Sequence, residues 1–203
     1  MNIAIIGCGY IGMETAKIWT QKGFHVTATT RTQARLDELA TVAQKNVIIK
    51  GNNEEEFAPL ISNNEAILIT ISADSREHYE SAYLHTAQIF RRLALEMNTP
   101  RDLIYTSSTS VYGEHHGKWV DENSELLASS QQAKVLIEAE KTFLSLGNLG
   151  WNVCILRFAE IYGPNRTLSE RVKKLKNQAL PGSGDHYTNM VHKDDCANAI
   201  DHA

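Results

Sequence analysis

A glycine-rich segment near the amino terminus has the spacing that phosphate binding requires. Residues 7–12 read Gly-Cys-Gly-Tyr-Ile-Gly, after a short apolar run and at the start of an amphipathic segment. In a strand–loop–helix unit, Gly7 permits the tight turn, Gly9 lets the backbone approach a pyrophosphate, and Gly12 lets the helix pack on the strand. Free N–H groups at the helix start then bind the phosphates. The alternative is a glycine-rich turn without a ligand. We predict a dinucleotide site formed by Gly7, Cys8, Gly9, Tyr10, Ile11 and Gly12.

The residues after the second predicted strand indicate which dinucleotide binds. A site for NAD has an acidic residue about 20 positions after the loop, where it accepts a hydrogen bond from the ribose 2′-OH. This sequence has Thr30, Arg31 and Thr32 there, and no acid. The Arg31 guanidinium and the two threonines suit a 2′-phosphate, because a charged pair of this kind is strong. The sequence therefore favours NADP(H) over NAD(H); the alternative is an ordinary surface arginine at a helix start.

Three further segments carry a resemblance to a known family. They read Ile-Tyr-Thr-Ser-Ser-Thr-Ser-Val-Tyr-Gly at residues 104–113, Ile-Leu-Arg-Phe-Ala-Glu-Ile-Tyr-Gly-Pro at 155–164, and Asn-Met-Val-His-Lys-Asp-Asp at 189–195. With the glycine loop, they resemble the extended short-chain dehydrogenase/reductase family, in its NAD-dependent epimerase/dehydratase branch. The resemblance spans nearly the whole chain. It is specific for the superfamily and weak for any one substrate.

The resemblance implies catalytic residues, and one of them is missing here. The family uses a Ser or Thr to hold the substrate oxygen, a Tyr as acid/base, and a Lys four residues later that binds the nicotinamide ribose and lowers the Tyr pKa. Ser108 matches the first and Lys134 the last, but Ser130 stands where the Tyr belongs. A serine hydroxyl is far less acidic than a phenol and cannot replace it. The family's usual glycine is also absent after the fourth strand, where Ile71 and Ser72 are expected to line the cofactor.

Other interpretations of these residues stay open. Lys134 has an alternative as a helix-surface lysine that pairs with Glu138. Four other side chains near the strand ends are candidates for the proton donor in place of the missing tyrosine: Tyr112, Tyr162, His115 and His116. For the two tyrosines we favour packing in turns, and for the two histidines a solvated loop. Adjacent histidines point apart and no further ligand has suitable spacing, so we predict no metal site.

The three cysteines have no CxxC pairing, which argues against a disulfide framework or a zinc site. Cys8 lies inside the glycine loop, where a helix amino terminus can lower a thiol pKa. One hypothesis is therefore a redox switch on cofactor binding. The favoured alternative is a small residue that fits the turn.

Alternating strand and helix patterns predict the fold that positions these residues. Apolar, β-branched runs, typical of strands buried on both faces, occupy residues 2–6, 25–30, 47–50, 66–71, 102–107, 152–157 and, less clearly, 188–192. Helical periodicity follows residues 33–44, 76–97 and 130–146. We predict an α/β Rossmann-type fold, a doubly wound parallel sheet of about seven strands. Residues 1–203 form one domain, residues 160–190 contribute to a small substrate lobe, and the Gly/Pro-rich residues 179–185 mark the excursion to it.

Composition limits the remaining function classes. The chain has 203 residues and a net charge of −4, which argues against nucleic-acid binding. No apolar stretch approaches the ~18 residues of a membrane span. The N-terminus lacks a signal-peptide pattern and a reducing cytoplasm is the expected location. The resemblance also implies a homodimer through helices 76–97 and 130–146. The chain ends at Ala203, where many relatives continue, so we expect a short member or part of a longer protein.

Two functions follow from these residues. The first is an NADP(H)-binding oxidoreductase or epimerase/dehydratase-like protein that acts on a sugar nucleotide or another hydroxyl or carbonyl compound. The second is a dinucleotide-binding sensor or regulatory module on an inactivated scaffold, suggested by the missing tyrosine.

Overall fold

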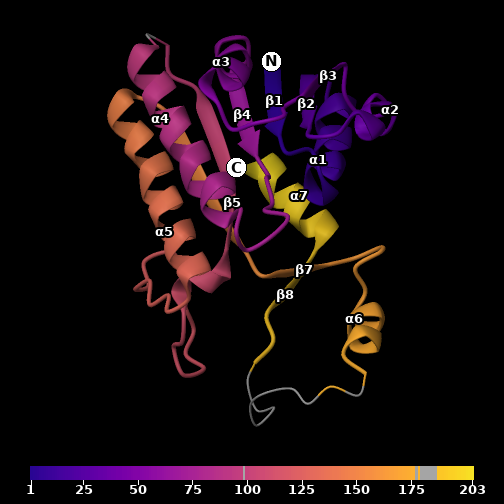
Figure 1. The fold of residues 1–203 in the computed structure, drawn as a ribbon, viewed down its shortest axis with the longest axis vertical. Coiled ribbons are helices and arrows are strands. Elements are labelled where there is room, and N and C mark those ends of the chain that lie inside the picture. The colour runs from indigo at the N-terminus through magenta and orange to yellow at the C-terminus, as the bar shows by residue number, and fades with distance from the viewer. Residues whose placement is uncertain (98, 177, 179–186) are drawn as a thin grey trace.

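A parallel β-sheet forms the centre of the computed structural model, which describes residues 1–97, 99–176, 178 and 187–203. The sheet has six strands in the order β3-β2-β1-β4-β5-β6, and every neighbouring pair is parallel (Figure 1). The strands are β1 (Asn2–Ile6), β2 (His25–Thr30), β3 (Lys45–Ile48), β4 (Ala66–Ile69), β5 (Asp102–Ser108) and β6 (Asn152–Phe158). The order reverses direction at β1, so the carboxyl ends of β1 and β4 flank the crevice where such sheets bind ligands.

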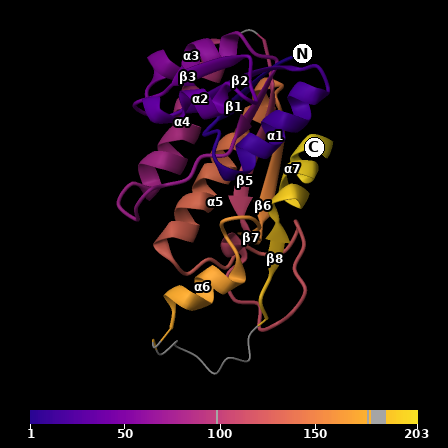
Figure 2. The same ribbon diagram turned by 90° about the vertical axis from the view of Figure 1, so that its right-hand side faces the viewer.

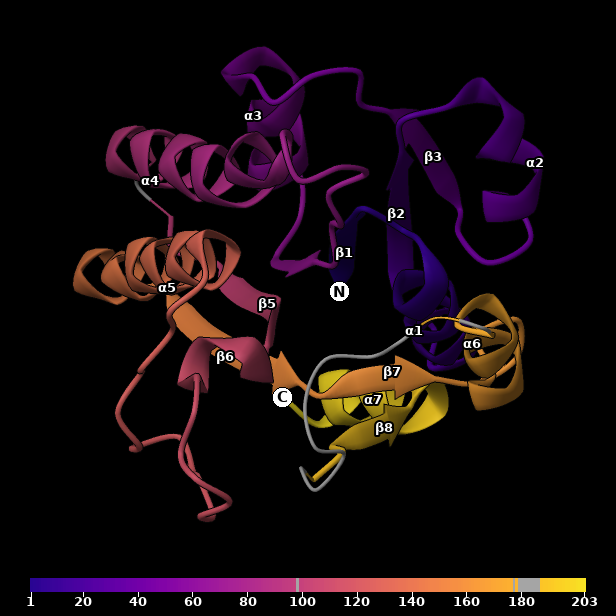
Figure 3. The ribbon, with the colours of Figure 1, turned by 60° about the horizontal axis from the view of Figure 1, so that its bottom comes forward.

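Helices cover both faces of the sheet, as predicted. They are α1 (Tyr10–Gln21), α2 (Leu36–Leu39), α3 (Glu54–Ser62), α4 (Thr86–Glu96), α5 (Gln131–Leu144) and α7 (Lys193–His202). Figure 3 shows α3, α4 and α5 on one side of the strands, and α1 and α7 on the other. Within the described residues, no helix combines the length and apolarity of a membrane crossing.

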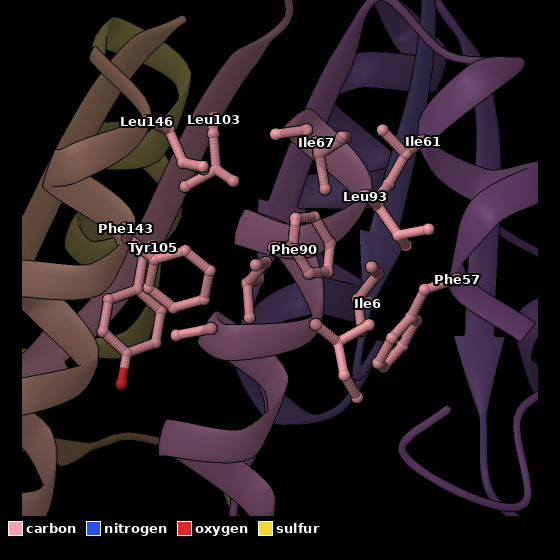
Figure 4. Packing of buried hydrophobic residues seen from close by; sticks show 14 of the residues in the cluster. Ile6, Phe57, Ile61, Ile67, Phe90, Leu93, Leu103, Tyr105, Phe143 and Leu146 are labelled. Atoms are coloured by element: carbon pink, nitrogen blue, oxygen red, sulfur yellow. The ribbon is translucent and has the colours of Figure 1, made fainter. Parts of the chain in front are cut away.

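The largest of the three hydrophobic clusters of the described residues lies between the sheet and helices α3, α4 and α5. Its aromatic rings form a chain in which the ring centroids of Phe57 and Phe90 lie 5.6 Å apart, those of Phe90 and Phe143 5.9 Å, and those of Phe143 and Tyr105 4.7 Å (Figure 4). All four side chains are buried. Rings of this size bury a large apolar area in fixed geometry, so the strand ends are held by a rigid support.

Of the three predicted helical segments, residues 130–146 form α5 and the start of a 3-10 turn much as expected, whereas the other two are not continuous α-helices. Residues 33–44 form a 3-10 turn (Gln33–Arg35) and the single turn α2, and the Thr41 hydroxyl there donates to the Glu38 carbonyl. In residues 76–97, a π-helical stretch (Ser81–His85) precedes α4, and the Thr86 hydroxyl donates to the Ala82 carbonyl. A hydrophobic period does not distinguish α-helix from short 3-10 or π-helical stretches.

The segment after β6 leaves the main sheet. Strands β7 (Glu160–Tyr162) and β8 (Met190–His192) pair in parallel as a separate two-stranded sheet, and α6 (Leu168–Lys174) lies between them in sequence. Figure 2 shows these three elements at the end of the molecule away from the amino terminus. The last predicted strand therefore exists but is not a seventh strand of the main sheet. The excursion predicted at residues 179–185 lies outside the described residues.

Candidate functional site

The glycine loop connects β1 to α1, and two of its glycines are required by the chain's own packing. Gly7 has φ +80°, and a Cβ there would lie 2.8 Å from the Ile71 Cα. A Cβ on Gly12 would lie 3.0 Å from the Thr70 hydroxyl and 3.2 Å from Ile5. Gly7 therefore permits the turn, and Gly12 the close approach of helix to strand.

Gly9, unlike Gly7 and Gly12, has room for a side chain in the structure. The nearest atom to a Cβ on this residue is the Gly7 carbonyl oxygen, at 3.7 Å. Gly9 is the N-cap of α1, and no side chain caps this helix in the part of the chain that the structure describes. The helix start therefore offers unpaired N–H groups beside open space, which suits an anion such as a pyrophosphate.

Three side chains hold the loop in this conformation. Thr29 accepts a hydrogen bond from the Gly7 N–H at 2.9 Å, and the Thr70 hydroxyl donates to the Gly7 carbonyl at 2.7 Å. The Arg35 guanidinium donates to the Cys8 carbonyl at 3.0 Å. A residue of β2 and residues that follow β2 and β4 therefore fix the loop at the end of β1, which preorganises it for a ligand.

A cavity of about 620 Å³ lies over this loop, within the usual range of ligand sites. Most of the predicted site residues line it: Gly7, Cys8, Gly9, Tyr10, Ile11, Thr30, Arg31, Thr32, Ile71, Ser72 and Ser108. Gly12 lies beneath the loop, and Lys134 is not part of the wall. The structure thus brings the residues of both sequence motifs into one space.

The wall of this first cavity is cationic. Arg31, Arg35, Lys50 and Arg166 line it, and no Asp or Glu does within the described residues. Two of these cations pair with carboxylates outside the lining: Arg31 with Asp74 at 3.3 Å (Nη1 to Oδ2) and Arg35 with Glu38 at 2.9 Å (Nε to Oε2). The cavity therefore has groups that attract phosphate and lacks, in its described wall, a carboxylate to accept from a ribose hydroxyl.

A second cavity of about 680 Å³ adjoins the first under the β7–α6 segment. Five residues line both cavities: Ser107, Ser108, Phe158, Ile161 and Arg166. Ser108 ends β5, and its side-chain oxygen accepts a hydrogen bond from the Ser110 N–H at 3.2 Å. Two ligands bound in the two cavities would therefore meet at Ser108.

Helix α5 does not bring the expected Tyr and Lys positions, Ser130 and Lys134, to the place where the two cavities meet. Ser130 is its N-cap and accepts a hydrogen bond from the Ala133 N–H at 3.2 Å. Lys134 is exposed, and the α5 side chain that lines the cavity is the apolar Leu136. Glu138, the other partner considered for Lys134, pairs with Lys141 at 2.7 Å instead. The ribose-binding role of Lys134 stays a prediction without support from its position.

Tyr112 packs, as the sequence favoured. It is buried, and its hydroxyl accepts a hydrogen bond from Arg157 Nη1 at 3.1 Å. Arg157 also forms a buried ion pair with Glu140, with 2.8 Å between Nη2 and Oε2. The hydrogen bonds to Glu140 and Tyr112 raise the Arg157 pKa above its ordinary value. Tyr112 is therefore part of a structural network behind the site.

The redox hypothesis for Cys8 is not supported. The thiol is buried, and desolvation raises its pKa from the ordinary value of 9.0 to about 12. Burial here outweighs the opposing effect of the nearby Arg35. Cys8 fits the turn as a small buried residue.

Sequence reasoning missed four residues near the cavities: Arg35, Asp74, His78 and Arg166. Arg166 stacks on the Tyr10 ring, with its guanidinium carbon 4.6 Å from the ring centroid. The available signal for Arg35 was its closeness in sequence to Arg31, after the end of the second predicted strand. Asp74, His78 and Arg166 come from segments between the regular helices and strands, where no pattern marks them.

Comparison with known proteins agrees with this geometry. Residues 3–203 match the profile of the NAD dependent epimerase/dehydratase family. The chain belongs to this family. It is 29% identical over 203 residues to Protein YeeZ of Escherichia coli K12, covering 98% of this chain and 71% of that protein.

Two solved structures of similar fold hold nucleotide ligands. UDP-glucose 4-epimerase from Thermotoga maritima, solved with UDP-glucose, has a TM-score of 0.81 at 18% identity, over 98% of this chain and 72% of that one. UDP-glucuronic acid 4-epimerase from Bacillus cereus, solved with UDP-glucuronic acid and NAD, has a TM-score of 0.79 at 18% identity and the same coverage. The family therefore uses a nicotinamide dinucleotide, and this chain has the family's fold.

Proposed function

We propose that this chain binds NADP(H) in the first cavity and transfers hydride to or from a hydroxyl or carbonyl compound in the second. Gly7, Cys8, Gly9, Tyr10, Ile11 and Gly12 form the pyrophosphate loop. Thr30, Arg31 and Thr32 bind the 2′-phosphate, and Ile71 and Ser72 line the ribose side. The substrate lobe is residues 160–190, and the substrate class is a sugar nucleotide, as in the two solved relatives, or another hydroxyl or carbonyl compound.

The cationic wall of the first cavity carries this proposal. A 2′-phosphate adds about two negative charges, and the wall carries four cationic side chains, of which two, Arg31 and Arg35, pair with carboxylates, Asp74 and Glu38, that lie outside the described lining. An NAD site gains its affinity for the ribose from an acidic acceptor. This balance of charge favours NADP(H) over NAD(H).

Ser108 is the proposed catalytic residue. When bound, the nicotinamide supplies or accepts the hydride. Ser108 lies where the two cavities meet, so its hydroxyl can hold the substrate oxygen at the reacting carbon. Hydrogen bonding to that oxygen stabilises the charge that develops on it.

The test is a change in nicotinamide absorbance, with NADPH and a panel of carbonyl compounds, and with NADP⁺ and a panel of sugar nucleotides and simple hydroxyl compounds. We expect turnover with at least one class, and a loss of about 100-fold or more in kcat for Ser108→Ala because an oxyanion donor is removed. The matched control is Ser110→Ala, which lies two residues away on the same turn. Bound NADPH with no turnover across either panel contradicts the catalytic half of the proposal.

The second candidate is a dinucleotide sensor without turnover. The observation that favours it is the apolar Leu136 on the cavity wall, with Lys134 exposed and Ser130 used as a helix cap. A sensor binds NADPH with wild-type affinity after Ser108→Ala and changes its affinity for a partner protein with cofactor. Binding to a partner that does not respond to cofactor rejects this candidate.

A homodimer through α4 and α5 is also proposed. Leu95 on α4 is 58% exposed and Leu144 on α5 is 50% exposed. Sedimentation at micromolar concentration should give a dimer, and Leu95→Glu should give a monomer. A monomeric wild-type protein rejects the homodimer.

The proposed location remains the cytoplasm, which cell fractionation tests.

A further inference from the structure

An ion pair joins residues from the two sides of the glycine loop, and one of them, Arg31, lines the first cavity. Arg31 follows β2 and Asp74 follows β4, and these two strands flank β1, which ends in the glycine loop. Arg31 Nη1 and Asp74 Oδ2 lie 3.3 Å apart, with 60% and 53% of the two side chains exposed. The pair therefore bridges the space between the strand ends over the loop where we expect the pyrophosphate.

A second contact crosses the same space. The Asn52 side-chain amide, after β3, donates to the Ser81 carbonyl, at the start of the π-helical stretch. Residues 72–85, which we call the strap, are also held by a hydrogen bond from the Ala73 N–H to the Tyr83 hydroxyl at 3.3 Å. Contacts from the β2 and β3 side thus meet the strap at two points.

We propose that Asp74 determines the preference between NADP(H) and NAD(H) by competing with the 2′-phosphate for Arg31. This inference rests on the proposed function. A phosphate that binds Arg31 competes with the Asp74 carboxylate for the guanidinium N–H groups and lies near its negative charge. The 2′-hydroxyl of NAD(H) carries no charge, so it meets neither cost.

Asp74 is ionised and held in this position by its neighbour. His78 Nδ1 and Asp74 Oδ1 are hydrogen-bonded at 2.8 Å. This hydrogen bond and the nearby Arg31 keep the Asp74 pKa below its ordinary value. The carboxylate is therefore charged at neutral pH, and the bond to His78 keeps it facing Arg31.

The test compares the dissociation constants of NADPH and NADH for wild-type protein and Asp74→Asn at low salt. Asn keeps the shape and removes the charge. We expect NADPH to bind about fivefold more tightly to the variant, the upper end for an exposed ion pair, and NADH to change less than twofold. Because exposed charges are screened, the gain should shrink in high salt.

The matched control is Glu77→Gln, which removes one negative charge from the same strap at an exposed position. It should leave the NADPH-to-NADH affinity ratio unchanged. In an Arg31→Ala background, Asp74→Asn should lose most of its effect, since the competition requires Arg31.

The outcomes separate this inference from the proposed function. Binding of both nucleotides with an unchanged ratio overturns the role of Asp74 and leaves the proposed function intact. Weaker NADH binding by Asp74→Asn also overturns it, because Asp74 would then accept from the ribose hydroxyl. No binding of either nucleotide to any of these proteins overturns the proposed function and this inference with it.

Discussion

The hydroxyl of Tyr10 donates a hydrogen bond to the carbonyl oxygen of Pro164 at 2.7 Å. Tyr10 belongs to the glycine loop, and Pro164 follows β7. Arg166 lies over the face of the same ring, and the Lys193 amine lies 5.4 Å from its centroid. One loop residue therefore contacts the segment that lines the second cavity, so the two cavities share a mechanical connection.

Removing that hydrogen bond should loosen the substrate lobe. In Tyr10→Phe, we expect faster amide hydrogen exchange at residues 163–168 and a change of less than about twofold in the NADPH dissociation constant, because the loop N–H groups are untouched. Tyr79→Phe is the control, since Tyr79 also lines the first cavity. Unchanged exchange at residues 163–168 would show that the bond does not hold the lobe.

The glycine loop offers a direct separation of folding from binding. Gly9→Ala adds a methyl group to open space, so we expect an unchanged Tm but at least tenfold weaker NADPH binding, because the methyl group occupies the pyrophosphate's approach. Gly7→Ala should lose stability by about 1–2 kcal/mol or more, since its φ is +80° and its Cβ would meet Ile71. Thermal denaturation and calorimetry measure both. Full NADPH affinity in Gly9→Ala would contradict the assigned pyrophosphate position.

The sequence predicted the elements whose signals are local. The glycine spacing and the β-branched runs identified β1, the loop and the parallel sheet, because burial on both faces of a parallel sheet leaves a continuous apolar run. Arg31 was found because the end of β2 has a fixed relation to the loop. Asp74 and Arg166 were not, because their positions depend on loops that reach the site across the sheet. The motif also could not predict the orientation of Lys134, since a match in spacing does not specify which face of α5 meets the cavity.

Thiol chemistry tests the environment of the loop. Desolvation raises the Cys8 pKa to about 12 and the Cys196 pKa to about 11, so both thiols stay protonated in the folded protein at pH 8. Native protein should react slowly with a thiol reagent at both positions, and unfolded protein fast. A fast-reacting native Cys8 would contradict the buried loop.

The same shifts give a pH dependence of stability. The folded pKa of Cys8 lies above its ordinary value of 9.0, so the unfolded chain loses this proton first. The contribution to the free energy of unfolding is complete below pH 9 and is lost as pH rises from about 9 to about 12. Cys8→Ala should flatten this alkaline fall in urea titrations, and an equally steep fall would reject the assignment.

The buried ion pair behind the site should be sensitive to loss of one partner. The side chains of Glu140 and Arg157 are 2% and 16% exposed. Glu140→Gln leaves the guanidinium without its carboxylate and should cost about 3 kcal/mol or more of unfolding free energy in urea. Glu138→Gln, on the same helix but 56% exposed, should cost less than about 1 kcal/mol. Equal costs for the two variants would show that burial does not determine the effect.

Titration calorimetry with NADPH and NADH, on wild-type protein and on Arg31→Ala, tests the central claim most directly. The account predicts that both nucleotides bind wild-type protein, that NADPH binds more tightly, and that Arg31→Ala weakens NADPH by about tenfold while NADH changes less than twofold. Absence of heat with both nucleotides, or equal losses for both in Arg31→Ala, would contradict it.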